Sequence, residues 1–212
     1  LNNVLLGFMK DTEAVGYFTA ATKIMVITMS ISSALGAVIM PRTSNLIAEE
    51  RMDEFKALVQ KSYDFIFALA MPLMVGLIFT SPSAVLLLSG EGFVPAILTS
   101  QIVAFNILTV GLSGVMGIQV LYPLGKINIV ILCTSIGAII NVFLNVLLIP
   151  RYGHNGTAVA YMLAEMTVTV SMFFIGKRYI PIRFLKRQHL NYVLGSVVMG
   201  VCLYFISWLG LG

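Results

Sequence analysis

The chain has 212 residues, of which 58% are hydrophobic and only 10% are charged. Soluble globular domains carry about 25% charged residues, so this composition excludes an ordinary water-soluble domain. The net charge is +4, but the basic residues are spread among the polar segments rather than along one face, which argues against a nucleic-acid partner.

Apolar residues fall into six long blocks separated by short polar segments. A helix needs about 20 residues to cross a bilayer, and backbone groups in lipid must be paired within their own segment. Strands of a membrane barrel would be about 10 residues long and strictly alternating, a pattern that this sequence lacks. We therefore predict an all-α, polytopic membrane helical bundle with spans at residues 15–40, 63–88, 96–121, 127–149, 157–176 and 190–211.

Residues 1–9 are apolar but too short to cross a bilayer. Because the chain starts at Leu1 rather than Met, we expect this segment to be the end of a transmembrane helix that is truncated upstream. The chain would then be a fragment of a larger membrane protein.

The first span is followed by Pro41, which we expect to mark its exit from the membrane. Residues 43–61 then combine apolar and charged side chains at near-helical spacing. This pattern predicts an amphipathic helix on the cytoplasmic surface. A simple extension of the next membrane helix explains the same pattern equally well. Asp64 stands at the start of that next span, where it can reach headgroup water.

Two charged side chains, Lys23 and Glu165, lie well inside predicted spans. A charge within a bilayer costs at least ~2.5 kcal/mol and usually faces a cavity or a partner. Lys23 is about two turns from the outer end of its helix and is able to snorkel outward. Glu165 is near the middle of its helix, so the alternatives are a functional role and an interhelical hydrogen bond made by the protonated acid.

Uncharged polar side chains recur in the third, fourth and fifth spans at positions that share a helix face. Each one taken alone is explained by hydrogen bonding between helices. Several helices with such stripes instead indicate a hydrated pathway. These residues are Gln101, Asn106 and Gln119 in the third span, Asn141 and Asn145 in the fourth, and Thr157, Tyr161 and Thr169, beside Glu165, in the fifth.

Lys and Arg residues concentrate in alternate polar segments, which sets the orientation in the membrane. One side holds Arg42, Arg51, Lys56, Lys61, Lys126, Lys177, Arg178, Arg183, Lys186 and Arg187, whereas the other holds Lys10 and Arg151. The positive-inside rule places the first set in the cytoplasm. The basic segment 177–189 also contains aromatic and aliphatic residues, which suits anionic lipid headgroups, although enforcing the topology explains it as well.

Motifs for catalysis or cofactor binding are missing from the sequence. His154 and His189 are far apart, and Cys133 and Cys202 lie in apolar blocks as small packing residues. The chain contains neither a P-loop nor a dinucleotide-binding glycine motif. We therefore expect a protein that is not an enzyme and that uses no cofactor and no metal.

Several short motifs resemble one transporter superfamily. LLGFMKDTEAVGYFTAATKI contains a Gly-Tyr pair with a Lys six residues after the Tyr, and SSALGAVIMPRTSNL contains the following Pro-Arg. GEGFVPA and LNVLLIPRYGHNGTAVAYMLAE follow in the same order. Together they resemble the second half of the bacterial polysaccharide repeat-unit (O-antigen) flippases. These belong to the multidrug, oligosaccharidyl-lipid and polysaccharide exporter superfamily, whose fold is MATE-like.

The resemblance implies a transporter of 12 to 14 helices in two halves, of which this chain is the second. It implies a bacterial cytoplasmic (inner) membrane protein that flips lipid-linked oligosaccharide by alternating access. The partners would be a polyprenyl-pyrophosphate-linked sugar, membrane lipids and the missing N-terminal half. The cargo would meet Lys23, Asn141, Asn145, Gln101 and Asn106, and Glu165 would couple transport to an ion or proton.

Other functions fit the sequence less well and remain open. A cation-coupled multidrug exporter of the same superfamily would need an aromatic, acid-lined cavity. A membrane-embedded glycosyltransferase or polymerase would need an acidic or histidine catalytic set in a large external loop. A purely structural membrane subunit would leave Lys23 and Glu165 without a purpose.

Overall fold

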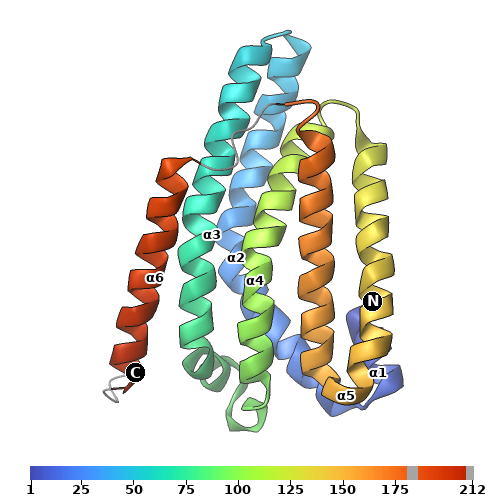
Figure 1. Ribbon diagram of the computed structural model, residues 1–212, viewed down its shortest axis with the longest axis vertical. Helices are drawn as coiled ribbons and strands as arrows, with labels where there is room; N and C mark the ends of the chain where they lie inside the picture. Colours follow the sequence, from blue (N-terminus) through green and yellow to red (C-terminus); the bar gives the residue numbers. More distant parts are fainter. Residues whose placement is uncertain (181–185, 209–212) are drawn as a thin grey trace.

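The computed structural model describes residues 1–180 and 186–208, with side chains at all of these positions except 31–37 and 206–208. The described residues form helices and no strands, which confirms the all-α polytopic bundle (Figure 1). The elements in chain order are α1 (Asn2–Met9), α2 (Thr12–Ala48), α3 (Met52–Ser89), the short 3-10 helix η1 (Glu91–Phe93), α4 (Ala96–Gly114), the π-helix η2 (Val115–Leu121), α5 (Ile127–Gly176) and α6 (Arg187–Trp208).

Three helical segments in the described part of the chain are long and apolar enough to cross a membrane. They are α3, the continuous segment Ala96–Leu121 formed by α4 and η2, and α5. The 50 residues of α5 fold back on themselves, so that its two arms run antiparallel (Figure 1). Large apolar side chains such as Leu87 (85% exposed) and Phe174 (62% exposed) cover the outside of the bundle. Contiguous exposure of this kind fits a surface that faces lipid.

Two glycines make the turn between the arms of α5 possible. Gly153 adopts φ +54° and ψ −131°, a conformation that L-residues with a side chain rarely adopt. At Gly156 a Cβ atom would lie 2.6 Å from the carbonyl oxygen of Leu148, so only glycine allows the arms to approach this closely. Pro150 lies inside the first arm, and the chain turns at Gly153. A proline removes only its own N–H group, whereas the turn needs a positive φ.

The expected amphipathic segment at residues 43–61 divides between two long helices, and residues 52–61 match the alternative of an extension of the next membrane helix. The α2 helix continues through Pro41 to Ala48, and α3 starts at Met52 after a tight turn. The hydroxyl groups of Thr43 and Ser44 both donate to the carbonyl oxygen of Met40 beside the proline. Buried Leu46, Phe55 and Val59 pack into one apolar cluster, so protein rather than lipid headgroups covers the apolar face.

The turns alternate between the two ends of the bundle as the charge pattern requires. Residues 49–51, 122–126 and 177–180 lie at one end, drawn at the top of Figure 1. The turn from α1 to α2, η1 and the turn of α5 lie at the other end. The basic set that we predict to be cytoplasmic is therefore gathered at the first end. Its member Arg183 and the rest of 181–185, as well as residues 209–211 of the last predicted span, lie outside the described residues.

The last helix, α6, packs along α3 at the edge of the bundle (Figure 1). At the predicted cytoplasmic end, the carboxylate of Asp64 accepts hydrogen bonds from Gln60 Nε2 at 2.8 Å and Lys186 Nζ at 2.5 Å. The His189 Nε2 atom lies 3.0 Å from the same carboxylate. Because the backbone N–H of Lys186 donates to His189 Nδ1, it is Nε2 that carries the proton and donates to Asp64. Asp64 is thus bound by three protein side chains, contacts that its position at the start of the span did not predict.

Candidate functional site

Lys23 lies on α2 with its side chain exposed. It lines a groove of about 430 Å³ together with Thr19 of α2, Ser89 at the end of α3 and Phe93 of η1. The Phe93 ring packs edge-on against Tyr17, with ring centroids 5.7 Å apart. Among the described side chains, no acidic group forms an ion pair with Lys23. The groove therefore presents an unneutralised cation beside an aromatic ring, level with the end of α3 at Ser89.

Asn141 and Asn145 lie inside the bundle, on the first arm of α5. Asn145 is fully buried, and its Nδ2 atom lies 3.1 Å from Asn141 Oδ1 and 2.8 Å from the Asn141 carbonyl oxygen. The same Nδ2 atom also lies 3.1 Å from Asn2 Oδ1 on α1. The three amides join α1 to α5, while Asn145 Oδ1 has no partner within the described residues.

Gln101 and Asn106 both lie on α4, where Gln101 is half-buried and Asn106 is fully buried. Gln101 Nε2 donates to the carbonyl oxygen of Ile78 on α3 at 3.2 Å, which is a contact between helices. Asn106 is fully buried, and neither its Oδ1 nor its Nδ2 atom has a partner in the described part of the chain. A buried amide without partners costs about 1–3 kcal/mol, which makes Asn106 an unusual residue for a purely structural role.

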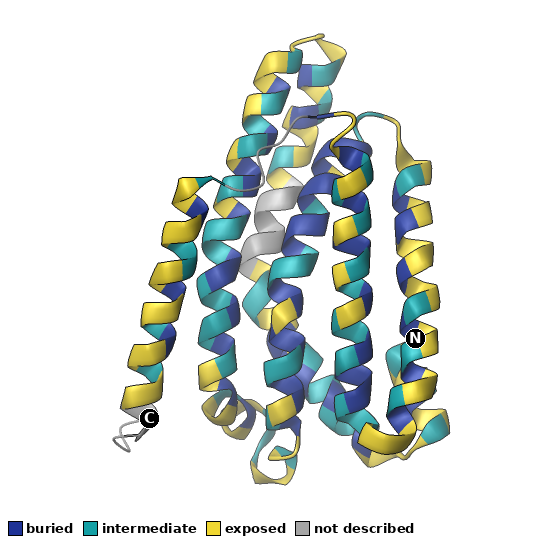
Figure 2. Ribbon diagram, viewed as in Figure 1, coloured by how far each residue is buried: buried dark blue, intermediate teal, exposed yellow. Residues whose placement is uncertain are grey.

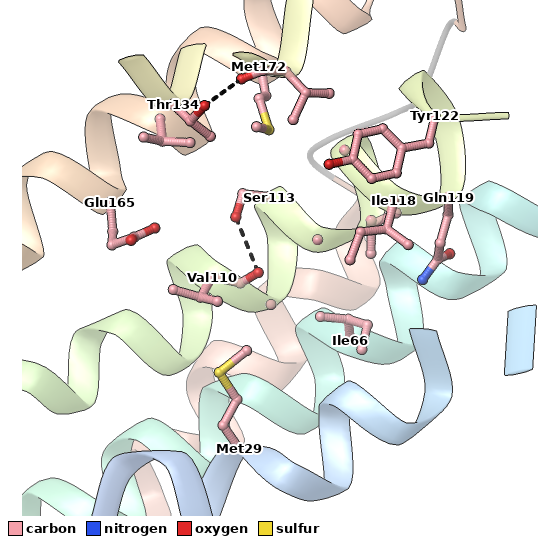
Figure 3. A pocket seen from close by; sticks show the side chains of 16 residues that line it. Met29, Ile66, Val110, Ser113, Ile118, Gln119, Tyr122, Thr134, Glu165 and Met172 are labelled. Atoms are coloured by element: carbon pink, nitrogen blue, oxygen red, sulfur yellow. Dashed lines mark hydrogen bonds between the residues drawn. The ribbon is translucent and has the colours of Figure 1, made fainter. Parts of the chain in front are cut away.

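Glu165, on the second arm of α5, borders a cavity of about 530 Å³ (Figure 3). The cavity lies between α2, α3, the α4–η2 segment and both arms of α5. A second hollow, of about 230 Å³, shares Thr134, Glu165 and Val168 with it and extends to Asn2 and Asn141. Glu165 therefore stands between two hollows, one of which reaches the buried amides.

The polar stripe predicted around Glu165 faces the interior of the bundle. Thr157 and Thr169 are buried, whereas Met166 and Val170 on the other side of the arm are exposed. Thr169 Oγ1 also lies 2.9 Å from the carbonyl oxygen of Thr109, which links α5 to α4. The stripe thus serves two purposes: it borders the cavity at Glu165 and makes a contact between helices at Thr169.

The structure distributes the predicted site residues over separate places. Lys23 lies in its own groove, Glu165 borders the large cavity, and the buried amides lie between α1 and α5. Asn2 was not predicted as a partner of Asn145, because 143 residues separate them. The only feature of the sequence that pointed to Asn2 was the presence of its amide in the otherwise apolar segment 1–9.

Comparison with known proteins identifies relatives. The family model described as "Lipid II flippase MurJ" matches residues 9–211. The probable low-salt glycan biosynthesis flippase Agl15 of Haloferax volcanii is 24% identical over 200 residues, covering 94% of this chain and 42% of Agl15. The probable flippase AglR of the same organism is 24% identical over 167 residues, covering 77% of this chain and 35% of AglR.

A solved structure described as lipid II flippase MurJ in the inward closed conformation superimposes with a TM-score of 0.80 at 15% sequence identity. The match covers 95% of this chain and 42% of that protein, so the fold is a MurJ-like membrane transporter fold. The chain thus spans well under half the length of the relatives it matches. These matches support the predicted superfamily at the level of flippases, while the family model that matches is that of MurJ rather than of polysaccharide repeat-unit flippases.

Proposed function

Because this chain belongs to the family of the lipid II flippase MurJ, we propose that it forms the second lobe of a flippase for lipid-linked saccharides. The whole transporter moves a polyprenyl-pyrophosphate-linked sugar across the membrane by alternating access between two lobes. The chain is a multi-pass membrane protein of a transporter family. The curated relatives are archaeal, so the bacterial inner membrane remains a prediction from the motifs alone.

The observation that carries this proposal is the unneutralised Lys23. A pyrophosphate is an anion that a cation attracts strongly when nearby groups exclude water. Lys23 lies beside Phe93, whose ring is able to contact a sugar face, and beside Thr19 and Ser89, whose hydroxyl groups are able to bind phosphate or sugar oxygens. The polyprenyl tail stays in the surrounding lipid throughout, and no chemistry is performed on the cargo.

Glu165 provides the coupling in this proposal. It stands between two hollows inside the lobe, so an ion or proton bound there changes how the α4–η2 segment and the arms of α5 pack. The buried amides Asn141 and Asn145 lie next to the smaller hollow and tie it to α1. Occupancy of Glu165 thereby biases the lobe toward one of its two conformations.

Export measured in cells that depend on the intact protein tests the role of Lys23. Lys23→Ala should abolish export of the glycan while membrane insertion and protein level stay normal, and Lys23→Arg should retain part of it. Lys10→Ala removes a cation from the exposed turn before α2 and should leave export unchanged. Full export by Lys23→Ala would remove its proposed role, and export of cationic drugs in place of glycan would support the multidrug exporter.

A further inference from the structure

The large cavity next to Glu165 has the composition of a binding site for an organic molecule. Its volume of about 530 Å³ falls in the range of small-molecule pockets, roughly 300–1,000 Å³. Its walls are mostly aliphatic and sulfur-containing side chains, among them Ile66, Val168 and Met172. We propose that this cavity binds a lipophilic organic cation, whose ammonium group pairs with Glu165 and whose apolar body fills the remaining space.

The polar groups that line the cavity point to a cation. Ser113 Oγ donates to the carbonyl oxygen of Val110 at 3.1 Å, and Thr134 Oγ1 to that of Val130 at 2.9 Å, so both hydroxyl groups are already paired (Figure 3). Gln119 is 98% buried, and its Oε1 atom accepts no hydrogen bond from the described residues. Among the described residues, the groups left for a ligand are therefore the carboxylate of Glu165 and the hydroxyl of Tyr122, whereas Gln119 Oε1 is enclosed by protein and no Lys, Arg or His lines the cavity.

The arrangement of polar groups around the cavity favours an organic cation over a metal ion. A hard cation such as Ca²⁺ takes six to eight oxygen ligands, and the described residues contain no group of three or more His, Cys, Asp or Glu side chains suited to a metal. Figure 3 shows Glu165 and Gln119 on opposite sides of the cavity, with apolar side chains between them. An extended ligand with one charged end and an apolar body matches this arrangement.

The π-helix η2 forms the wall opposite Glu165 and the entrance to the cavity. It carries Ile118 and Gln119, and Tyr122 follows directly after it. Ile118 is 41% exposed and Tyr122 is 40% exposed, so the cavity opens beside the turn at residues 122–126, at the predicted cytoplasmic end. The wider turns of π-helices occur often at functional sites, and here they line the cavity.

A fluorescent probe with a neutral counterpart tests this site in the intact protein. Dansylcadaverine has an apolar naphthalene body and a terminal ammonium, and acetylation of its amine yields a neutral molecule of similar shape. Fluorescence titration in phosphatidylcholine nanodiscs, corrected with empty nanodiscs, measures the affinity of both probes. We expect the ammonium probe to bind about tenfold more tightly than the acetylated probe, because only the former pairs with a carboxylate away from water.

Three variants assign the binding to this cavity. Glu165→Gln should weaken the ammonium probe about tenfold and leave the acetylated probe unchanged. Ile118→Trp should block the entrance and abolish binding while Glu165 remains. Glu91→Gln, which removes an exposed carboxylate in η1, should change nothing.

Equal affinity for both probes in the wild-type protein would overturn the proposal. So would unchanged binding in both Glu165→Gln and Ile118→Trp. If Glu165→Gln does not yield a monodisperse protein, Ile118→Trp decides the matter, because it leaves the carboxylate in place. The titration requires no transport, so its result is independent of whether the protein is a flippase.

Discussion

Replacing Gly156 by alanine measures how closely the two arms of α5 pack. The added Cβ atom would lie 2.6 Å from the oxygen and 2.8 Å from the carbon of the Leu148 carbonyl group. Ordinary contacts begin near 3.4 Å, so the arms would have to separate by roughly 0.8 Å. Backbone atoms cannot rotate away as a side chain does. Overpacking of this kind costs about 1–3 kcal/mol.

Gly195→Ala is the matched control for this substitution. Gly195 lies inside α6, and a Cβ atom there would meet no atom within 4 Å. Alanine is more favourable than glycine in a helix by up to about 1 kcal/mol. We therefore expect Gly156→Ala to lower the free energy of unfolding and Gly195→Ala to leave it unchanged or to raise it slightly, a difference of about 2 kcal/mol or more between the two variants.

Denaturant unfolding of the purified protein in one detergent, followed by circular dichroism, measures this difference. Transport provides a second readout, because the arms of α5 carry Asn145 and Glu165. A Gly156→Ala protein as stable as Gly195→Ala would refute the close approach of the arms. A large loss of stability in Gly195→Ala would instead show that α6 has a packing partner absent from the structural description.

Three further substitutions test polar contacts. Asn145→Ala should lower the free energy of unfolding by about 1–3 kcal/mol, because it leaves buried amide groups without partners. Amide hydrogen exchange in α1 should become faster in this variant. Unchanged exchange would argue against the contact with Asn2. Asp64→Asn should weaken the packing of α6 and lower the free energy of unfolding by about 1–3 kcal/mol. A double-mutant cycle with Lys186→Met tests the ion pair, because the effect of Asp64→Asn should nearly disappear in the Lys186→Met protein if that pair is responsible. Asn106→Leu should leave the free energy of unfolding unchanged or raise it, because both amide atoms of Asn106 lack described partners. Loss of transport with unchanged stability would support the predicted role of Asn106 in binding cargo. Marked destabilisation would show that the Asn106 amide has a further partner.

The membrane class of the protein follows from local properties of the chain. A span needs only enough consecutive apolar residues and internally paired backbone groups, and both requirements act within about 20 residues. The alternation of basic turns likewise depends on the order of the segments, and the structure places the turns at alternating ends accordingly. Helix ends were less predictable, because Pro41 and Pro150 both lie inside helices and end neither of them.

The sequence by itself determined an all-α bundle of apolar spans and the stripe of polar residues that contains Glu165, because each depends on neighbours along one helix. Only the tertiary structure decided which polar groups meet. Asp64 and His189 are 125 residues apart, and Asn2 and Asn145 are 143 residues apart. Such contacts depend on how helices rotate and pack against one another. The same packing separated the groove at Lys23 from the cavity at Glu165, two residues that the family resemblance assigned to one transport pathway.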